Sequence, residues 1–319
     1  MVLVDYIRYM IKVKKLKSIL NFKNPLVYIV ILNWNGYQDT VECMESLLRI
    51  KYRNFRVVLI DNASENNEYD KLIKKYKENS NIHIIRNKTN IGFAGGVNVG
   101  IKFSIENNAD YTLLLNNDTI VDKYFLNNLI EVTQLDNKIA VLSPNIYFYN
   151  KPNSVWAGGS QVKYFFPPIS NSYKNDYPGE VNEVTGCCML IKNSVFKKIG
   201  LFREEYFAYQ EEMDFNFRVI KNGYKIFVVP GSKIWHKVSS STGGGFNKII
   251  AYYKMRNKVL YAKFNYPKYY WLTYWFYIFI YFFYHQINSV KSSKFDTSKA
   301  LMSGLIDGVT NKYFKNKSF

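Results

Sequence analysis

The sequence predicts an α/β protein built on an open, mostly parallel twisted sheet that is flanked by helices. Short apolar runs of strand length alternate with amphipathic stretches, and polar residues follow the runs directly. Such alternation gives a sheet with right-handed crossovers. The 319 residues are 48% hydrophobic with only 8 prolines and 17 glycines, which excludes a disordered or low-complexity chain. Three cysteines do not make a disulfide framework, so we expect a reducing compartment.

The first half of the chain supplies four predicted strands. They are Val27–Leu32, which is a continuous apolar run, and Phe55–Ile60, Ile82–Ile85 and Tyr111–Leu115. A helix is expected to begin near Asp39, where Asp39 and Glu42 have the spacing of a capping box. Two more helices are expected, one around Leu72 and one around Ile101.

The second half predicts a helix from Glu211 to Lys221 that Gly223 ends. Its first turn carries three acids, Glu211, Glu212 and Asp214, and an aromatic, uncharged stretch precedes them. Such surroundings remove water from an acid and make it more basic. A strand is expected at 226–229, with His236 shortly beyond it.

Both ends of the chain are basic or aromatic, within a formal net charge of +18. Residues 1–24 predict a basic amphipathic helix, which fits a solvated surface and a membrane surface equally well. Residues 269–284 form an uncharged run of Tyr, Trp and Phe that is somewhat shorter than a spanning helix. We therefore expect residues 246–319 to form a helical, aromatic region that associates with a membrane, with residues 269–284 either spanning it or only dipping into it; a buried core helix is the alternative.

Ligands of open α/β sheets bind beyond the carboxyl ends of the strands, and polar residues cluster there in this chain. Asn33 and Asn35 follow the first predicted strand, Asp61 the second, and Asn116–Asp118 the fourth. The first turn lacks G-x-G-x-x-G, and no G-K-[ST] occurs, so dinucleotide dehydrogenases and P-loop proteins are excluded. Carboxylate and amide oxygens suit Mg²⁺ or Mn²⁺ held together with phosphate oxygens.

Five landmarks together resemble the inverting family 2 glycosyltransferases, in particular their rhamnosyltransferase-like branch. They are VILNWNG, VVLIDNAS, NKTNIGFAGGVNVGI, YTLLLNNDT, and the block from EVTGCCMLIKNSVF through FAYQEEMDFNFRVIKNGYKIFVVPGSKIWH. The resemblance runs from about Val27 to His236 and implies a GT-A fold at residues 25–245. Residues 25–122 would then form the nucleotide-sugar half and residues 123–245 the acceptor half.

The resemblance implies a role for each matching residue. Asp118 corresponds to the acid that binds the metal, with His236 completing the site and Mg²⁺ or Mn²⁺ as the cofactor. Glu212 aligns with the catalytic base, with Glu211 as the alternative and Asp214 as the third acid of the motif. The donor-binding residues would be Asn33, Asn35, Asp61, Asn90, Gly92, Gly96, Asn98, Asn116, Asn117 and Asp118. The acceptor side would include Trp156, Gly186, Cys187, Phe207 and Tyr209.

The predicted function is metal-dependent, inverting transfer of a sugar from a nucleoside-diphosphate donor to a hydroxyl group. The branch favours dTDP-L-rhamnose, and UDP-sugars remain open. The acceptor would be a polyprenyl-linked or growing cell-surface glycan at the cytoplasmic face of the membrane. The basic and aromatic ends would then contact an anionic membrane surface as a peripheral or monotopic anchor.

Two alternatives belong to other classes. A nucleic-acid-binding protein would explain the charge, but the basic residues are spread widely and no RRM, KH or zinc pattern is present. We therefore expect no nucleic-acid partner. A catalytically inactive membrane-bound scaffold is the second alternative, because Asn116 and Glu212 each replace the usual Asp of the family motifs.

Overall fold

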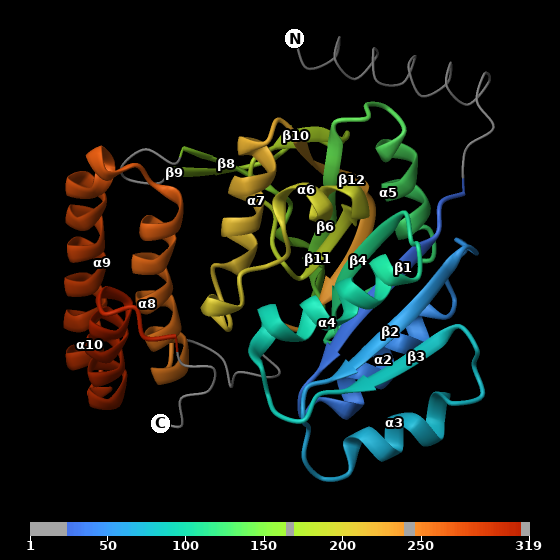
Figure 1. The fold of residues 1–319 in the computed structure, drawn as a ribbon, viewed down its shortest axis with the longest axis horizontal. Helices are drawn as coiled ribbons and strands as arrows, with labels where there is room; N and C mark the ends of the chain where they lie inside the picture. Colours follow the sequence, from blue (N-terminus) through green and yellow to red (C-terminus); the bar gives the residue numbers. More distant parts are fainter. Residues whose placement is uncertain (1–23, 164–168, 239–245, 314–319) are drawn as a thin grey trace.

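The computed structural model describes residues 24–163, 169–238 and 246–313. The predicted helix at residues 1–24 therefore lies outside the described residues, apart from Asn24. In the described residues the chain forms a ten-stranded mixed sheet in the order β10-β12-β6-β11-β4-β1-β2-β3, to which β5 and β7 are added by pairing with β12 and β6 (Figure 1). Helices cover both faces of this sheet. The predicted α/β class is confirmed.

The four strands predicted in the first half form one parallel block, β4-β1-β2-β3. Each strand is one residue longer than predicted and ends on the polar or charged residue that follows the predicted strand. The four strands are β1 (Val27–Asn33), β2 (Phe55–Asp61), β3 (Ile82–Arg86) and β4 (Tyr111–Asn116). The intervening helices are α2 (Tyr37–Leu47), α3 (Glu68–Tyr76) and α4 (Gly92–Glu106).

The capping box expected at Asp39 is wrong. Helix α2 begins two residues earlier, and no side chain caps it. Asp39 and Glu42 instead accept hydrogen bonds from the Lys237 ammonium, both at 2.7 Å. A full positive charge from a distant strand attracts both carboxylates more strongly than neutral backbone N–H groups do.

The second half adds strands of both directions to this block. The elements are β5 (Thr119–Val121), α5 (Phe125–Thr133), β6 (Ile139–Phe148), β7 (Lys151–Ala157), β8 (Ser160–Lys163), β9 (Ile169–Ser172), β10 (Gly179–Val181), β11 (Cys188–Lys192), α6 (Asn193–Ile199), η1 (Glu204–Tyr206), α7 (Glu211–Lys221) and β12 (Lys225–His236). Strand β11 runs antiparallel between β4 and β6, and β8 and β9 form a separate hairpin.

The strand predicted at 226–229 is longer than expected. Strand β12 continues to His236, because its pairing with β6 shifts register between Val229 and Lys233 and then resumes. Pro230 lies in this irregularity, where the lack of an N–H group does not break a ladder hydrogen bond. His236 therefore ends a strand of the main sheet rather than lying in a loop beyond it.

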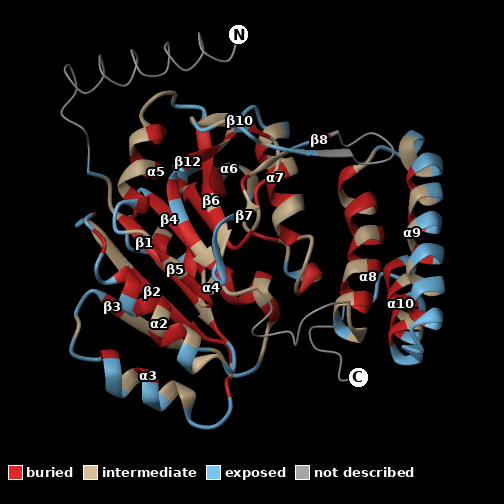
Figure 2. Ribbon diagram, turned by 180° about the vertical axis from the view of Figure 1, so that it is seen from behind, coloured by how far each residue is buried: buried red, intermediate tan, exposed pale blue. Residues whose placement is uncertain are grey.

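Two cores fill the two faces of the sheet. One packs the side of β1 that carries Ile29 and Ile31 against α2 and α5, and the other packs the side with Val30 against α4 and α7. The central strands are buried on both faces, while α3 is largely exposed at the end of the sheet (Figure 2). This rigid sheet fixes the positions of the residues that follow each strand.

The C-terminal region consists of three packed helices with their own aromatic core. They are α8 (Lys248–Asn265), α9 (Trp271–Lys291), which follows the short η2 (Lys268–Tyr270), and α10 (Phe295–Val309). Helix α10 approaches α8 closely at Gly304, where a β-carbon would lie 2.5 Å from the Tyr252 carbonyl oxygen. Figure 1 shows α8 nearest to the sheet domain and α9 outermost. Among the described residues, no helix combines the length and apolarity needed to cross a membrane.

Candidate active site

A polar network joins the carboxyl ends of three neighbouring strands. Asn33 ends β1 directly beside Asp61 at the end of β2, and its amide Nδ2 donates to the Asp61 carboxylate at 3.2 Å. The Asn33 Oδ1 accepts from the Thr40 hydroxyl at 2.8 Å, and Thr40 Oγ1 accepts from Asn117 Nδ2 at 2.9 Å. Asn117 follows Asn116, the last residue of β4. Strand register thus brings the first, second and fourth predicted strand ends into one site.

The Asp61 carboxylate is fully buried in this network. Besides Asn33, it accepts from the Ser64 backbone N–H at 3.2 Å, and Arg86 at the end of β3 lies 3.7 Å away. Asn35 has a positive φ of 52°, and its side chain accepts from the Glu65 N–H at 2.8 Å. Asn33, Asn35 and Asp61, which are predicted to bind the donor, therefore belong to one hydrogen-bonded network. Arg86 lies beside this network, and the sequence analysis missed it.

Asn62 organises the loop that contains Asn90 and Gly92, and the sequence analysis missed it as well. Its Nδ2 donates to Asn90 Oδ1 at 2.9 Å and to the Gly92 carbonyl at 3.2 Å. Gly92 has a φ of +77°, and a β-carbon there would lie 2.4 Å from the Phe207 carbonyl oxygen. Gly92 therefore permits the close approach of two backbone segments.

Two predicted donor residues have structural contacts instead. A β-carbon on Gly96 would lie 2.4 Å from the Leu32 side chain, so Gly96 allows α4 to pack on β1. The buried Asn98 amide donates to the Phe202 carbonyl at 2.8 Å and to Glu204 at 3.1 Å. Because these bonds occupy its Nδ2, Asn98 connects α4 to the loop before η1 rather than facing a ligand.

Asp118 and His236 form a buried pair at the end of the sheet. The short strand β5 pairs antiparallel with β12, which places Thr119 opposite His236. As a result His236 Nε2 lies 3.0 Å from Asp118 Oδ1, and each side chain is only 8% exposed. The Trp156 ring lies against the imidazole with ring centroids 4.6 Å apart.

This pair fits a divalent cation. Two adjacent ligands of an octahedral Mg²⁺ or Mn²⁺ ion, each about 2.1 Å from the metal, lie about 3 Å apart, which matches the observed separation. Among the described residues, no group of three or more His, Cys, Asp and Glu side chains could hold a metal. Two protein ligands are typical of sites where substrate phosphates and water complete the coordination of Mg²⁺.

Glu211 and Glu212 begin α7 as an acidic pair, of which Glu211 is buried and Glu212 half-buried. One carboxyl oxygen of each, Oε2, is buried without a hydrogen-bond partner. Burial raises the pKa of both carboxyls, and the neighbouring Glu212 raises that of Glu211 further. The Lys254 ammonium and the hydrogen bond from Glu211 act in the opposite direction on Glu212.

Asp214 does not share this chemistry. Its carboxylate is fully buried and accepts from four side chains, namely Arg203 at 2.6 Å, Arg218 at 2.7 Å, Asn265 at 2.8 Å and Tyr206 at 3.3 Å. Both oxygens are occupied, since Oδ1 accepts from Arg203, Tyr206 and Asn265 and Oδ2 accepts from Arg218. The structure corrects the expected catalytic role: Asp214 anchors the start of α7.

Glu183, after β10, is an acidic residue that the sequence analysis missed. Burial, followed by the nearby Glu212, raises its pKa to about 7. Its Oε2 is buried without a hydrogen-bond partner. Nothing in the local sequence indicates this, because the contact depends on how β10 and α7 pack.

The segment before β11 lies between the end of β4 and the start of α7. The Cys187 carbonyl accepts from the Asn116 N–H at 2.9 Å, and a β-carbon on Gly186 would lie 3.6 Å from the Glu212 β-carbon. Cys187 is only 3% exposed and packs in the core, and its expected contact with an acceptor stays a prediction. Phe207 is also buried, and the ammonium of Lys254 lies 5.7 Å from the centroid of the half-buried Tyr209 ring.

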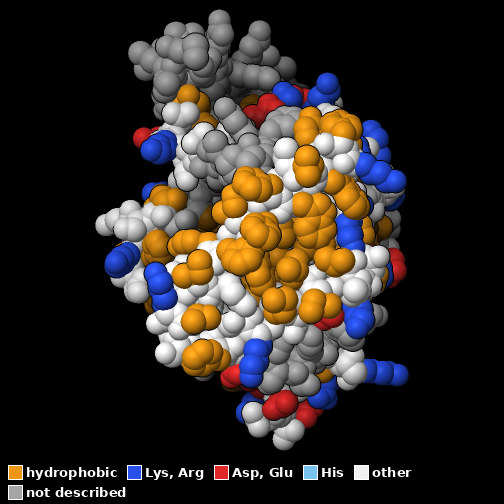
Figure 3. Space-filling model, turned by 90° about the vertical axis from the view of Figure 1, so that its left-hand side faces the viewer, with side chains coloured by type: hydrophobic (Ala, Val, Ile, Leu, Met, Phe, Trp, Pro, Cys, Tyr) orange, Lys and Arg blue, Asp and Glu red, His pale blue; other side chains and the backbone are white. Residues whose placement is uncertain are grey.

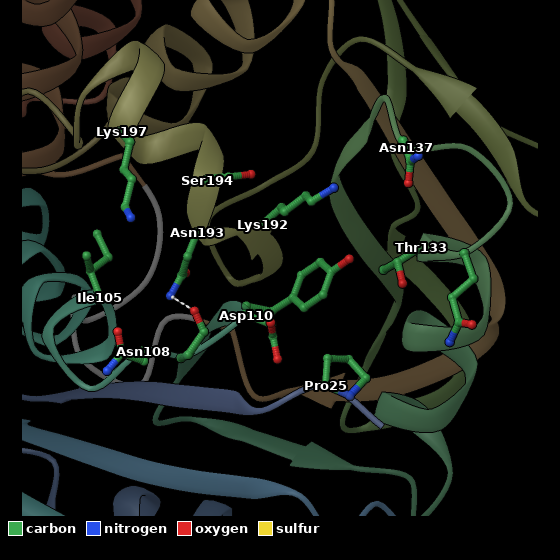
Figure 4. A pocket seen from close by; sticks show the side chains of 13 residues that line it. Pro25, Ile105, Asn108, Asp110, Thr133, Asn137, Lys192, Asn193, Ser194 and Lys197 are labelled. Carbon is green, nitrogen blue, oxygen red and sulfur yellow. Dashed lines mark hydrogen bonds between the residues drawn. The ribbon is translucent and has the colours of Figure 1, made fainter. Parts of the chain in front are cut away.

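A cavity of about 600 Å³ lies at the opposite edge of the sheet. Figure 4 shows Asp110, Lys192 and Lys197 around it, at the amino end of β4 and around the β11–α6 junction. Of the described residues that line it, none is a predicted site residue. Ligands of such sheets bind at the carboxyl ends of the parallel strands, so this cavity is not the candidate site.

The fold is GT-A-like: a mixed sheet with an Asp–His pair and buried acids beside the parallel strand ends. The glycosyl transferase family 2 model matches residues 28–200, and the chain belongs to that family.

Relatives and solved structures agree with this assignment. The chain is 27% identical over 206 residues to the low-salt glycan biosynthesis hexosyltransferase Agl10 of Haloferax volcanii, covering 62% of each chain. It is 26% identical over 223 residues to the poly-beta-1,6-N-acetyl-D-glucosamine synthase of Staphylococcus aureus, covering 70% of this chain and 52% of that one. The chain thus spans between half and two thirds of the length of these relatives. Its fold resembles that of the mannosyltransferase PcManGT from Pyrobaculum calidifontis, solved with GDP-Man and Mn²⁺, with a TM-score of 0.59, 11% identity and coverage of 96% and 95%.

Proposed function

We propose that this protein is an inverting hexosyltransferase that uses a nucleoside-diphosphate sugar and a divalent metal. The observation that carries the proposal is the Asp118–His236 pair, whose 3.0 Å separation suits two ligands of one metal ion, near the network at the strand ends. The printed title of PcManGT, with GDP-Man and Mn²⁺, supports the same donor class. Asn33, Asn35 and Asp61, with Asn90 and Arg86, would surround the nucleoside.

The reaction forms a bond between the acceptor oxygen and the anomeric carbon and breaks the bond from that carbon to the diphosphate. Glu212 accepts the proton of the attacking hydroxyl, because it holds the place of the base in the family motif and burial raises the pKa of its carboxyl. Glu211, whose carboxyl pKa is also raised by burial, is the alternative base. A metal at Asp118 and His236 would offset the charge of the departing diphosphate as a Lewis acid.

The identity of the sugar stays a prediction. The sequence motifs favour dTDP-L-rhamnose, whereas the relatives carry names of hexosyl-, N-acetylglucosamine and mannosyltransferase enzymes. The names of the relatives also support a glycan acceptor, and we infer that it is lipid-linked or at the cell surface. Thermal shift with dTDP-, UDP- and GDP-sugars, with and without Mn²⁺, distinguishes these donors.

Asp118→Ala tests the metal site directly. We expect it to abolish the Mn²⁺-dependent part of donor binding, because the diphosphate loses its anchored counter-ion. His236→Ala should weaken Mn²⁺ affinity more mildly. Donor and Mn²⁺ affinities equal to those of the parent in Asp118→Ala would reject the site.

We also infer that the outer face of α9 and α10 contacts an anionic membrane surface on the cytoplasmic side. Exposed apolar side chains gather on this face (Figure 3). The exposed apolar side chains of α9 and α10 include those of Leu272, Phe276, Phe279, Ile280, Phe283, Ile287 and Phe295. Lys268, Lys291, Lys294 and Lys299 lie in or beside these helices, and the chain has a charge of +18, which complements anionic lipid. An apolar face with basic neighbours is typical of a helix that lies in the membrane interface.

Vesicle sedimentation of the full chain tests this contact. The parent should pellet with anionic vesicles and stay partly bound at high salt, because apolar insertion is not screened. A variant with Phe276, Phe279 and Phe283 changed to Ser should be released by salt. Complete release of the parent by salt would reject insertion.

A further inference from the structure

The turn that leads into the acidic pair has a strained backbone. Phe207, Tyr209 and Gln210 have φ values of 62°, 68° and 79°, a region that residues with a β-carbon rarely adopt. Gln210 directly precedes α7 and its acids, Glu211 and Glu212. Such a turn persists only where surrounding contacts fix it, and this one sets the direction in which both carboxyls point.

Two adjacent residues of α8 supply those contacts. Asn257 Nδ2 lies 3.0 Å from the Tyr206 carbonyl oxygen, 2.8 Å from that of Ala208 and 2.6 Å from that of Tyr209. Arg256 Nη2 donates to the carbonyls of Glu205 at 2.9 Å and Tyr206 at 2.7 Å. The side chains of α8 thus bind four backbone carbonyls between residues 205 and 209.

Both side chains are fully buried, and Arg256 also donates to Asn257 Oδ1 at 2.9 Å. The Phe207 ring stacks on Tyr253 of the same helix, with centroids 5.1 Å apart. On its other side the Phe207 carbonyl accepts from the Ala94 N–H at 3.2 Å. The turn is therefore fixed between α8 and the start of α4.

We propose that Arg256 and Asn257 are positioning residues for the transfer reaction, holding the 206–210 turn so that Glu212 stays half-buried and directed at the acceptor. This inference rests on the proposed function. It assigns a role in the chemistry to the C-terminal helices, which the sequence indicates only as a membrane-associating region.

The test compares Asn257→Ala with the parent, with Arg256→Lys as the conservative variant and Lys263→Met as the control. Lys263→Met removes hydrogen bonds of the same helix to the Gly308 and Val309 carbonyls, at 2.8 and 2.6 Å, on the side of α8 that faces α10. Hydrogen exchange of the amides at 206–212 should be at least about 10-fold faster in Asn257→Ala and unchanged in Lys263→Met. This measurement needs no substrate.

Turnover is measured as Mn²⁺-dependent hydrolysis of the donor that binds the parent. In Asn257→Ala we expect kcat to fall by about 10²-fold, because small displacements of reacting groups have effects of that size. The donor KM should stay unchanged, since the residues at Asp61 and Asp118 lie on other elements. Arg256→Lys should fall between parent and Asn257→Ala.

The pH profile separates positioning from general destabilisation. The titratable groups that face the acidic pair in the described chain are Glu183, Tyr209 and Lys254, and none is altered. When the turn relaxes, water reaches the pair, so the acid limb of kcat in Asn257→Ala should move to lower pH.

Three results overturn the inference: unchanged exchange, faster exchange with parental kcat, or a joint loss of kcat and donor binding without movement of the acid limb. A parent that hydrolyses no donor rejects the proposed function instead.

Discussion

Glu183→Gln should stabilise the protein at neutral pH. The carboxyl lies buried near Glu212, and its pKa is raised from 4.5 to about 7. An acid whose pKa is raised by folding contributes its full stability below pH 4.5 and loses it as the pH rises through about 7. Since one pKa unit corresponds to about 1.4 kcal/mol, the expected loss is at most about 3 kcal/mol at pH 8.

The glutamine variant keeps the shape of the side chain and cannot ionise, so it lacks this loss. Urea unfolding of the parent and the variant at pH 5 and pH 8 gives the four free energies of unfolding that are needed. The advantage of Glu183→Gln over the parent should grow between the two pH values by up to about 3 kcal/mol. Glu180→Gln is the matched control, because Glu180 is 54% exposed in the adjacent strand and should follow the parent. If Glu183→Gln and the parent lose stability in parallel, the carboxyl does not titrate in the way argued above.

Two further predictions concern the acids of α7. Glu212→Gln should keep donor affinity and lower turnover by about 10²-fold or more, the usual size of a lost general base, as measured by steady-state kinetics; a larger effect of Glu211→Gln would make Glu211 the base. Asp214→Asn should lower the free energy of unfolding by about 3 kcal/mol in urea titrations, because Arg203 and Arg218 lose a buried counter-ion, and a change below about 1 kcal/mol would contradict the anchoring role.

The strand ends could be predicted from sequence because they depend on local pattern. A run such as Val27–Leu32 is apolar on both faces, which is typical of a buried parallel strand, and a polar residue follows it directly. The register of the two adjacent parallel strands β1 and β2 then places Asn33 directly beside Asp61. The direction expected for the pKa of Glu211 and Glu212 agrees with their surroundings, because burial raises the pKa of both carboxyls.

Contacts between distant segments could not be predicted in this way. Lys237 bonds Asp39 and Glu42 across almost two hundred residues, and no local pattern distinguishes these acids from ordinary capping residues. Asp214 resembles its neighbours in the motif, yet Arg203, Arg218 and Asn265 occupy its carboxylate. Local sequence indicates which residues are acidic, whereas tertiary packing decides which of them can accept a proton.

The same reasoning changes how the C-terminal region should be regarded. Its aromatic composition indicates a surface for lipid, and the outer face of α9 carries the exposed rings. Its inner helix, however, contributes Asn265 to Asp214 and Asn257 to the turn before Glu211, and both amides are buried. Removing α8 would therefore withdraw polar partners from α7 at both points. A chain shortened before α8 should retain the strand-end network of Asn33 and Asp61 but lose the fixed geometry of the acids, so donor binding and turnover should respond differently to the truncation.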